Sequence, residues 1–332
     1  MSTLSTHETY KLLKRQLKEL ISVGNLISKH TSPSALFEGH SWTVLKLIFL
    51  KLYVEKIYVP IIRKRYTNMF YVDLFAGSGL DQFEQYKDAL IPGSPLISCI
   101  FPERGFDHLY LVEKYGEFAE ALKERMEFAY LPEKFSLFNC DANKIYTKII
   151  EEIEENSRAH FLAFIDPYAF EVEWLTLERL LKSKVRGDFI ILFQANRIAQ
   201  NVGGVLSGRI KNPRVLNAFF GDTVWIRFVQ ERRKKGEKIT DAVLEYYTKK
   251  VTCSKRRESV VERIKVPLFR KPRCYFLIFV TNKTIRNNPW MEKVIELKEL
   301  IEKGDQELVD SIISELLGKP KSILSYMDSE ED

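Results

Sequence analysis

Residues 164–170 could hold an amino group in position for reaction. They read Phe-Ile-Asp-Pro-Tyr-Ala-Phe and close a short apolar run. The Asp166 carboxylate and the Pro167 carbonyl can accept hydrogen bonds from an exocyclic amine and direct its lone pair at an electrophilic carbon. The ring of Tyr168 or Phe170 can stack on the base that carries the amine. An Asp-Pro turn followed by core aromatics is the alternative interpretation.

A second acidic and glycine-rich segment lies at residues 73–79, which read Asp-Leu-Phe-Ala-Gly-Ser-Gly. An acidic residue at a strand end can meet a cationic or amino group of a ligand, and glycines let the backbone approach where a Cβ would clash. The third glycine of the dinucleotide fingerprint is missing, which disfavours a nicotinamide or flavin enzyme. A plain strand-to-helix turn would use the same residues.

Two further carboxylates end predicted strands. Glu113 follows Leu-Val, and its two acceptor oxygens match the vicinal hydroxyls of a ribose. Asp141 follows Asn-Cys, where a carboxylate could accept from the amino group of an adenine. A solvated strand-end Glu and a helix N-cap Asp are the respective alternatives.

These residues require a sheet that brings the strand ends together. Short apolar runs alternate with helical stretches, which predicts βαβ units and a parallel sheet buried on both faces. A hairpin follows them near the end of the chain, joined by residues 270–273. The predicted strands are Phe70–Phe75, His108–Glu113, Phe135–Asp141, Phe161–Asp166, Asp188–Gln194, Ser259–Phe269 and Cys274–Thr281.

Amphipathic spacing predicts the helices around this sheet. The stretch 80–93 is predicted as a loop over the ligand, Ser41 as the N-cap of a helix that meets Pro60, and Ser94 as the N-cap of the first crossover helix. The other predicted helices are 8–29, 213–220, 241–249, 289–302 and 306–317. The predicted organisation is an N-terminal helical extension (1–66), core strands one to five (67–197), a helical basic insertion (198–258), the hairpin and C-terminal helices (259–318) and an acidic tail (319–332).

Together these motifs resemble the three-Cys-motif partner family, a group of methyltransferase-like proteins. The resemblance covers most of residues 40–300 and adds Pro-Gly-Ser-Pro at 92–95, Trp174 and the stretch 216–225. More distantly, the chain is similar to the large-subunit ribosomal RNA adenine-N6 methyltransferases. The resemblance implies a Rossmann-like class I methyltransferase fold, α/β with a seven-stranded, mostly parallel sheet. It also implies an S-adenosyl-L-methionine pocket, carried by Asp73, Phe75, Gly77, Gly79, Glu113 and Asp141.

One departure from nucleic-acid amino-methyltransferases concerns the residues expected to be catalytic, Asp166, Pro167 and Tyr168. Those enzymes carry Asp/Asn/Ser-Pro-Pro-aromatic, whereas here Tyr168 follows Pro167 directly. The departure motivates a second hypothesis, a methyltransferase-fold binding protein without transferase activity that serves as a partner or nucleic-acid adaptor.

Positive charge is concentrated in one segment. The whole chain carries a net charge of +6, but residues 226–273 hold sixteen Lys or Arg against six acids. With aromatics interleaved, this segment suits phosphate contacts and base stacking. We therefore expect a nucleic-acid substrate, RNA rather than DNA, contacted by Arg256, Arg257 and Lys271 together with Phe170. A solvated charged face is the alternative.

Composition excludes several other classes. The 332 residues are 45% hydrophobic and 29% charged, with no membrane-spanning run and no secretory signal, so we expect a soluble cytoplasmic protein. The four cysteines show no CxxC spacing and the histidines no HxH or HExxH spacing, so reduced thiols and no metal are expected. A small-molecule methyltransferase is a third hypothesis, disfavoured by the basic segment.

Overall fold

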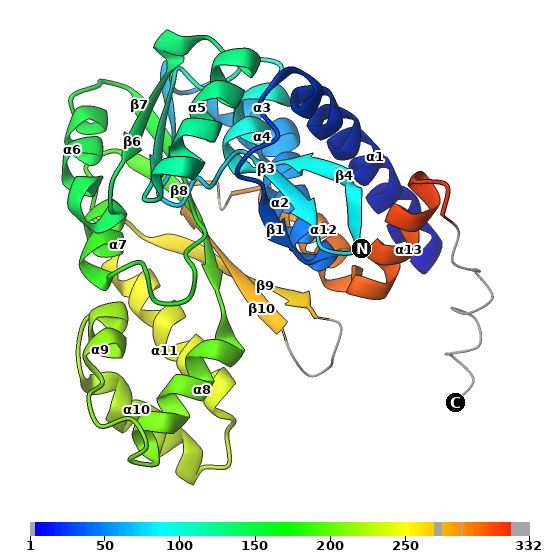
Figure 1. Ribbon diagram of the computed structural model, residues 1–332. Helices are drawn as coiled ribbons and strands as arrows, with labels where there is room; N and C mark the ends of the chain where they lie inside the picture. Colours follow the sequence, from blue (N-terminus) through cyan, green and yellow to red (C-terminus); the bar gives the residue numbers. More distant parts are fainter. Residues whose placement is uncertain (1–3, 269–273, 287, 320–332) are drawn as a thin grey trace.

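The computed structural model describes residues 4–319 except 269–273 and 287, and of Trp42 it describes the backbone only. Seven strands form one sheet in the order β6-β5-β2-β7-β8-β10-β9 (Figure 1). Strands β6 to β8 in this order are parallel, and β10 runs antiparallel to both of its neighbours. The seven strands are β2 (Asn68–Asp73), β5 (His108–Glu113), β6 (Phe135–Asn139), β7 (Ala159–Ile165), β8 (Arg186–Phe193), β9 (Ser259–Pro267) and β10 (Cys274–Asn282).

This topology confirms the predicted fold class, a Rossmann-like class I methyltransferase arrangement. It is the doubly wound order with an antiparallel strand inserted before the last one. The strands predicted from apolar runs are confirmed to within about two residues at each end, because such runs are buried on both faces of a parallel sheet.

Helices cover both faces of the sheet (Figure 1). Successive strand residues point to opposite faces, so that Tyr71 of β2 packs with α1, α2 and α12, whereas Val72 packs with α6, α7 and α11. The helices are α1 (Thr6–His30), α2 (Val44–Tyr53), α3 (Val59–Ile62), α4 (Ser94–Ile100), α5 (Gly116–Ala129), α6 (Ala142–Glu154), α7 (Trp174–Leu181), α8 (Ala195–Leu206), α9 (Arg214–Phe220), α10 (Val224–Lys234), α11 (Ile239–Ser254), α12 (Met291–Lys303) and α13 (Gln306–Leu316).

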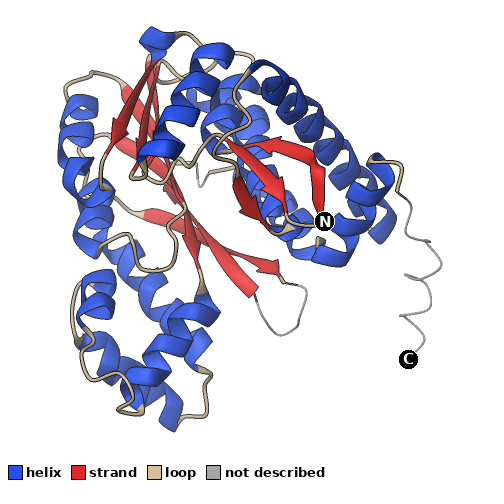
Figure 2. Ribbon diagram, in the orientation of Figure 1, coloured by secondary structure: helices blue, strands red, loops and turns tan. Residues whose placement is uncertain are grey.

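A second, three-stranded sheet corrects the predicted loop over residues 80–93. Strands β3 (Leu80–Phe83) and β4 (Tyr86–Pro92) form a hairpin, and β1 (Phe37–Gly39) pairs in parallel with β3. Figure 2 shows this small sheet beside the large one, next to α1. The loop prediction was wrong because residues 80–92 pair with one another as a hairpin, and a third strand more than forty residues upstream, which no local pattern reveals, extends it into a sheet.

Two predicted helix starts and one helix end also differ. Ser41 opens a 3₁₀ turn (Ser41–Thr43) instead of capping α2, and Gly93 takes the N-cap position predicted for Ser94. The helix continues past Pro60 to Ile62, through a π-helical segment at Val54–Tyr58. Proline lacks the N–H that an α-helix needs, and the change of hydrogen-bond pattern just before it lets the helix continue.

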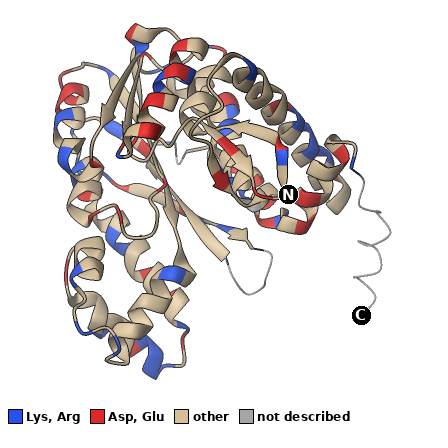
Figure 3. Ribbon diagram, viewed as in Figure 1, with Lys and Arg blue, Asp and Glu red and all other residues tan. Residues whose placement is uncertain are grey.

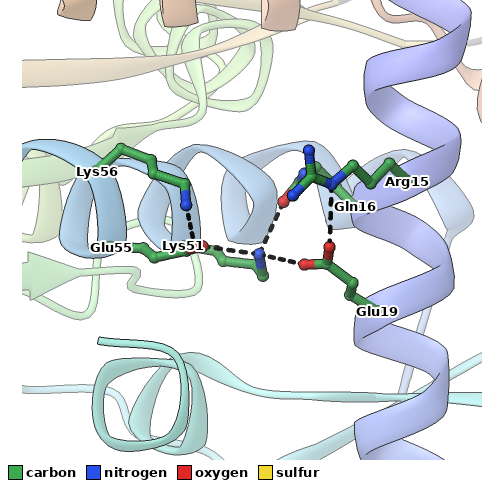
Figure 4. A network of polar contacts seen from close by, with 6 residues as sticks. All are labelled: Arg15, Gln16, Glu19, Lys51, Glu55 and Lys56. Atoms are coloured by element: carbon green, nitrogen blue, oxygen red, sulfur yellow. Dashed lines mark hydrogen bonds and ion pairs between the residues drawn. The ribbon is translucent and has the colours of Figure 1, made fainter. Parts of the chain in front are cut away.

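The N-terminal helices are anchored by a buried lysine. Lys51 of α2 has only 1% of its side chain exposed. Its ammonium donates to Gln16 and Glu19 of α1 at 2.8 Å each and to Glu55 at 2.9 Å (Figure 4). A buried cation is tolerated when it is paired and fully hydrogen-bonded, so these contacts fix α1 against α2.

Among the described residues, no helix is long and apolar enough to cross a bilayer.

Candidate functional site

A cavity of about 680 Å³ opens at the carboxyl ends of the parallel strands. In this fold class the ligand lies at that edge, where the strand order reverses between β2 and β7. The N-terminal extension contributes β1 and α2 to its wall. From the sequence-predicted set, the structure brings Phe75, Gly77, Glu113, Asp141, Asp166, Pro167 and Tyr168 to this cavity.

The cavity wall is acidic. It contains seven Asp or Glu side chains and three Lys or Arg. The three cations are Lys46, Lys114 and Arg197, and the acids are Glu38, Asp81, Glu84, Glu113, Asp141, Asp166 and Glu171. Such a wall favours a ligand that carries positive charge.

Gly77 and Glu113 form one corner of the cavity. Gly77 has φ +65°, and a Cβ placed on it would meet no atom within 4 Å, so its backbone faces open space. The Glu113 carboxylate accepts from the amides of Gly77 at 2.9 Å and Tyr115 at 2.8 Å. Burial raises the pKa of Glu113, although the two hydrogen bonds oppose the shift. Each carboxylate oxygen keeps a further lone pair for a hydroxyl donor.

Asp141 occupies both positions considered from the sequence. It is the N-cap of α6, where its carboxylate accepts from the amide of Asn143 at 2.9 Å, and it also lines the cavity. The cap fixes the direction of the carboxylate, while Ala142 beside it adds a small apolar surface to the wall.

Asp73 and Gly79 do not reach the cavity wall. The buried Asp73 carboxylate accepts from Ser94 Oγ at 2.7 Å, Tyr71 Oη at 3.0 Å and the Phe75 amide at 3.2 Å. Burial raises its pKa to about 7. A Cβ on Gly79 would lie 2.9 Å from Leu122 of α5, so this glycine serves helix packing. The direct ligand contact predicted for these two residues is therefore corrected: they shape the loop that carries Gly77.

Lys46 is a cavity residue that sequence reasoning missed. Its ammonium lies 2.5 Å from Asp166 Oδ2, and the two side chains are 13% and 17% exposed. Burial would lower the pKa of Lys46, but the carboxylates of Asp166, Asp81 and Asp73 outweigh burial and raise it. Burial raises the pKa of Asp81 to about 6, although Lys46 opposes the shift. The sequence feature that could have identified Lys46 is the position of a charged residue within an otherwise apolar helical run.

Tyr168 stands at the mouth of the cavity. Its ring is 63% exposed, and the Arg197 guanidinium lies 4.2 Å from the ring centroid. The next residue, Ala169, has φ +63°, a left-handed conformation that turns the chain directly after the tyrosine. Phe170 is directed elsewhere, against Phe219 with ring centroids 5.5 Å apart. Of the two rings predicted as stacking platforms, Tyr168 lines the cavity and Phe170 does not.

Among the described residues of the basic segment, no Lys or Arg lines the cavity. Arg256 and Arg257 precede β9, whose first residues pair with the last residues of β10 at the amino ends of the parallel strands. Arg257 donates there to the carbonyl of Lys184 at 2.9 Å. These two arginines therefore lie away from the cavity, because β9 runs in the same direction as the parallel strands and begins at their amino edge. Lys271 lies outside the described residues. Figure 3 shows further Lys and Arg on α9–α11.

The strand order and the cavity at its switch point define a Rossmann-like, class I methyltransferase-type fold. No family model and no curated protein matches the chain. Among solved structures, it is similar to a Legionella pneumophila protein at 14% identity and TM-score 0.45, covering 80% of this chain and 94% of that one.

Two other similar structures are O-methyltransferases. TomG from Streptomyces achromogenes, in complex with S-adenosylmethionine, is 12% identical with TM-score 0.38, and 80% of this chain and 98% of that chain are covered. The Bacillus cereus enzyme, in complex with S-adenosylhomocysteine, is 11% identical with TM-score 0.36. The match covers 80% of this chain and 100% of that chain. The fold assignment rests on the strand order of this chain itself.

Proposed function

We propose that this protein is an S-adenosyl-L-methionine-dependent methyltransferase. The observation that carries the proposal is the acidic cavity at the switch point, with the open Gly77 backbone and the Glu113 carboxylate at one corner. The cofactor supplies a methyl group already activated on a positively charged sulfonium. Glu113 would accept from its ribose hydroxyls and Asp141 from its adenine amino group, because both carboxylates line the cavity.

The chain's contribution to the reaction is placement. Asp166 follows β7, next to the strand that leads into the glycine loop, and lines the same cavity. There its carboxylate can accept from the attacking group and hold its lone pair in line. The Pro167 carbonyl is a second acceptor, approached by the amide nitrogen of Gln194 at 3.5 Å. The Lys46 ammonium already pairs with Asp166 Oδ2, so an amine has to use the remaining lone pairs of this carboxylate or displace the ammonium.

We propose a nucleic-acid base as acceptor, with an exocyclic amine of the adenine-N6 type as target and RNA favoured over DNA. Exposed Tyr168 offers a stacking surface at the cavity mouth, and Arg197 beside it supplies a cation for a phosphate. The kinship with three-Cys-motif partner proteins and ribosomal RNA adenine-N6 methyltransferases remains a prediction.

One observation favours a second candidate. The Lys46 ammonium neutralises the carboxylate that would orient an acceptor. A protein that binds nucleic acid or a protein partner without transferring a methyl group would have no need to free Asp166.

Calorimetric titration with S-adenosylmethionine and S-adenosylhomocysteine tests the first candidate. We expect micromolar binding, weakened several-fold in Glu113→Gln because one acceptor oxygen becomes a donor. Asp166→Asn should keep the affinity for S-adenosylhomocysteine, whose thioether is uncharged, to within a small factor but lose transfer of labelled methyl to pooled RNA and DNA. Folded protein that binds neither compound contradicts the methyltransferase assignment and favours the second candidate.

A further inference from the structure

A second, shallower groove adjoins the cavity on the side of α8. Its volume is about 690 Å³, and its walls are Asn196, Arg197, Gln200, Asn201, Arg209 and Ile210. Asn196 and Arg197 also line the main cavity, so the two spaces share a wall. Five of the six groove residues are amides or arginines.

The polar side chains are gathered by helix geometry. Arg197, Asn201 and Gly204 follow one another at intervals of four and three, which places them on one face of α8. The chain then reverses: the Ile210 amide donates to the Gly204 carbonyl at 2.9 Å. The Arg209 guanidinium lies 3.3 Å from the position that a Gly204 Cβ would take, so the missing side chain leaves room for it.

The charge of the groove is opposite to that of the cavity. The cavity wall carries seven acids against three Lys or Arg, whereas the groove wall carries two arginines and no acid. Among the described residues, no ion pair engages Arg197 or Arg209. Arg197 instead lies over the Tyr168 ring. Two unpaired guanidinium groups beside amides that can donate or accept suit phosphates and sugar hydroxyls.

We infer that this groove binds the sugar–phosphate backbone of a single-stranded nucleic acid next to the nucleotide whose base stacks on Tyr168. The inference rests on the proposed nucleic-acid acceptor and adds a contact surface next to the cavity. Phosphates are favoured over an acidic peptide because the aromatic platform stands at the junction of groove and cavity, where a base flanked by phosphates meets both.

The test is fluorescence anisotropy with a labelled twelve-nucleotide RNA, measured between about 50 and 300 mM salt. The variants are Arg197→Gln, Arg209→Gln and their double. The matched control is Arg256→Gln with Arg257→Gln, which removes the same charge at the opposite edge of the sheet. Thermal unfolding of each variant verifies that it is folded.

Each phosphate contact of a single strand contributes about 0.7 to the slope of log K against log salt, which corresponds to roughly five-fold in affinity near 0.1 M salt. We expect losses of that size in each single variant, about 25-fold in the double, and a slope lower by about 1.4. Equal weakening of the control, an unchanged slope, or tighter binding of a polyglutamate peptide than of RNA overturns the inference.

Calorimetry with S-adenosylhomocysteine separates the two proposals. Arg209 lies outside the cavity, so Arg209→Gln should bind S-adenosylhomocysteine like the wild type while it loses RNA. Groove-dependent RNA binding by a protein that binds no cofactor supports the groove and rejects the methyltransferase. Cofactor binding with RNA affinity insensitive to both arginines rejects the groove alone.

Discussion

Replacing Lys46 by methionine should change how the cavity discriminates between cofactor and product. Methionine keeps a long side chain against the wall of α2 but removes an ammonium that is 13% exposed. S-adenosylmethionine carries a sulfonium, whereas S-adenosylhomocysteine carries a neutral thioether. Removal of a nearby cation must therefore strengthen the binding of S-adenosylmethionine relative to that of S-adenosylhomocysteine.

The cavity size bounds the effect. A sphere of about 680 Å³ is roughly 11 Å across, so a sulfonium anywhere inside lies within about that distance of the wall. With an effective dielectric constant of about 20–40, two unit charges at that separation repel by about 0.8–1.5 kcal/mol. The affinity ratio of S-adenosylmethionine to S-adenosylhomocysteine should thus rise about 4- to 12-fold in Lys46→Met.

Calorimetric titration of both compounds measures this ratio directly. Lys114→Met is the matched control, since Lys114 lines the same cavity but is exposed, and water and salt screen its charge. Adding Asp166→Asn to Lys46→Met also removes the carboxylate that has lost its lysine partner. The ratio of the two affinities should then return toward the wild-type value. A ratio that stays constant or falls in Lys46→Met would refute the reasoning, because the ammonium would then not face the sulfonium.

Three predictions concern the scaffold. Lys51→Met removes the hydrogen bonds that a buried ammonium donates to Gln16, Glu19 and Glu55, and it leaves the buried Gln16 oxygen without its donor. This change should lower the free energy of unfolding by about 2 kcal/mol in urea titrations. Gly221→Ala should cost more than about 2 kcal/mol by the same measurement, because Gly221 has φ +76° and its Cβ would lie 2.3 Å from the Trp174 ring. Burial lowers the pKa of His160 from 6.5 to about 4, so the unfolded chain binds more protons between these values, and stability falls as pH drops through this window. For the wild type, His160 should account for about 3 kcal/mol of the fall in the free energy of unfolding between pH 7 and pH 4. In His160→Leu this contribution should be absent.

Local patterns predicted the parallel strands well because each is a short apolar run, and all of them except the edge strand β6 are largely buried. They also placed Glu113 and Asp141 at strand ends that meet at the cavity. Pairing between distant segments was beyond them: β1 and β3 join residues 37–39 to 81–83, and Lys46 reaches Asp166 across 120 positions. Nor can a count of charges tell which edge of a sheet they occupy: Arg256 and Arg257 of the basic segment precede β9 at the edge away from the cavity.

The N-terminal extension belongs to the site and to the core. Its helices α1 and α2 share one buried cluster with alternate residues of the central strands. Arg125 of α5 donates to the carbonyls of Ser32 at 3.1 Å, Ser34 at 2.6 Å and Ser78 at 2.6 Å, which ties the segment before β1 to the glycine loop. Because Lys46 and β1 complete the cavity wall, any movement of this extension changes both the charge and the size of the cavity. Through the ion pair of Lys46 with Asp166, the extension also reaches the residue proposed to hold the acceptor, whereas Tyr168 and α8 lie on parts of the chain outside it.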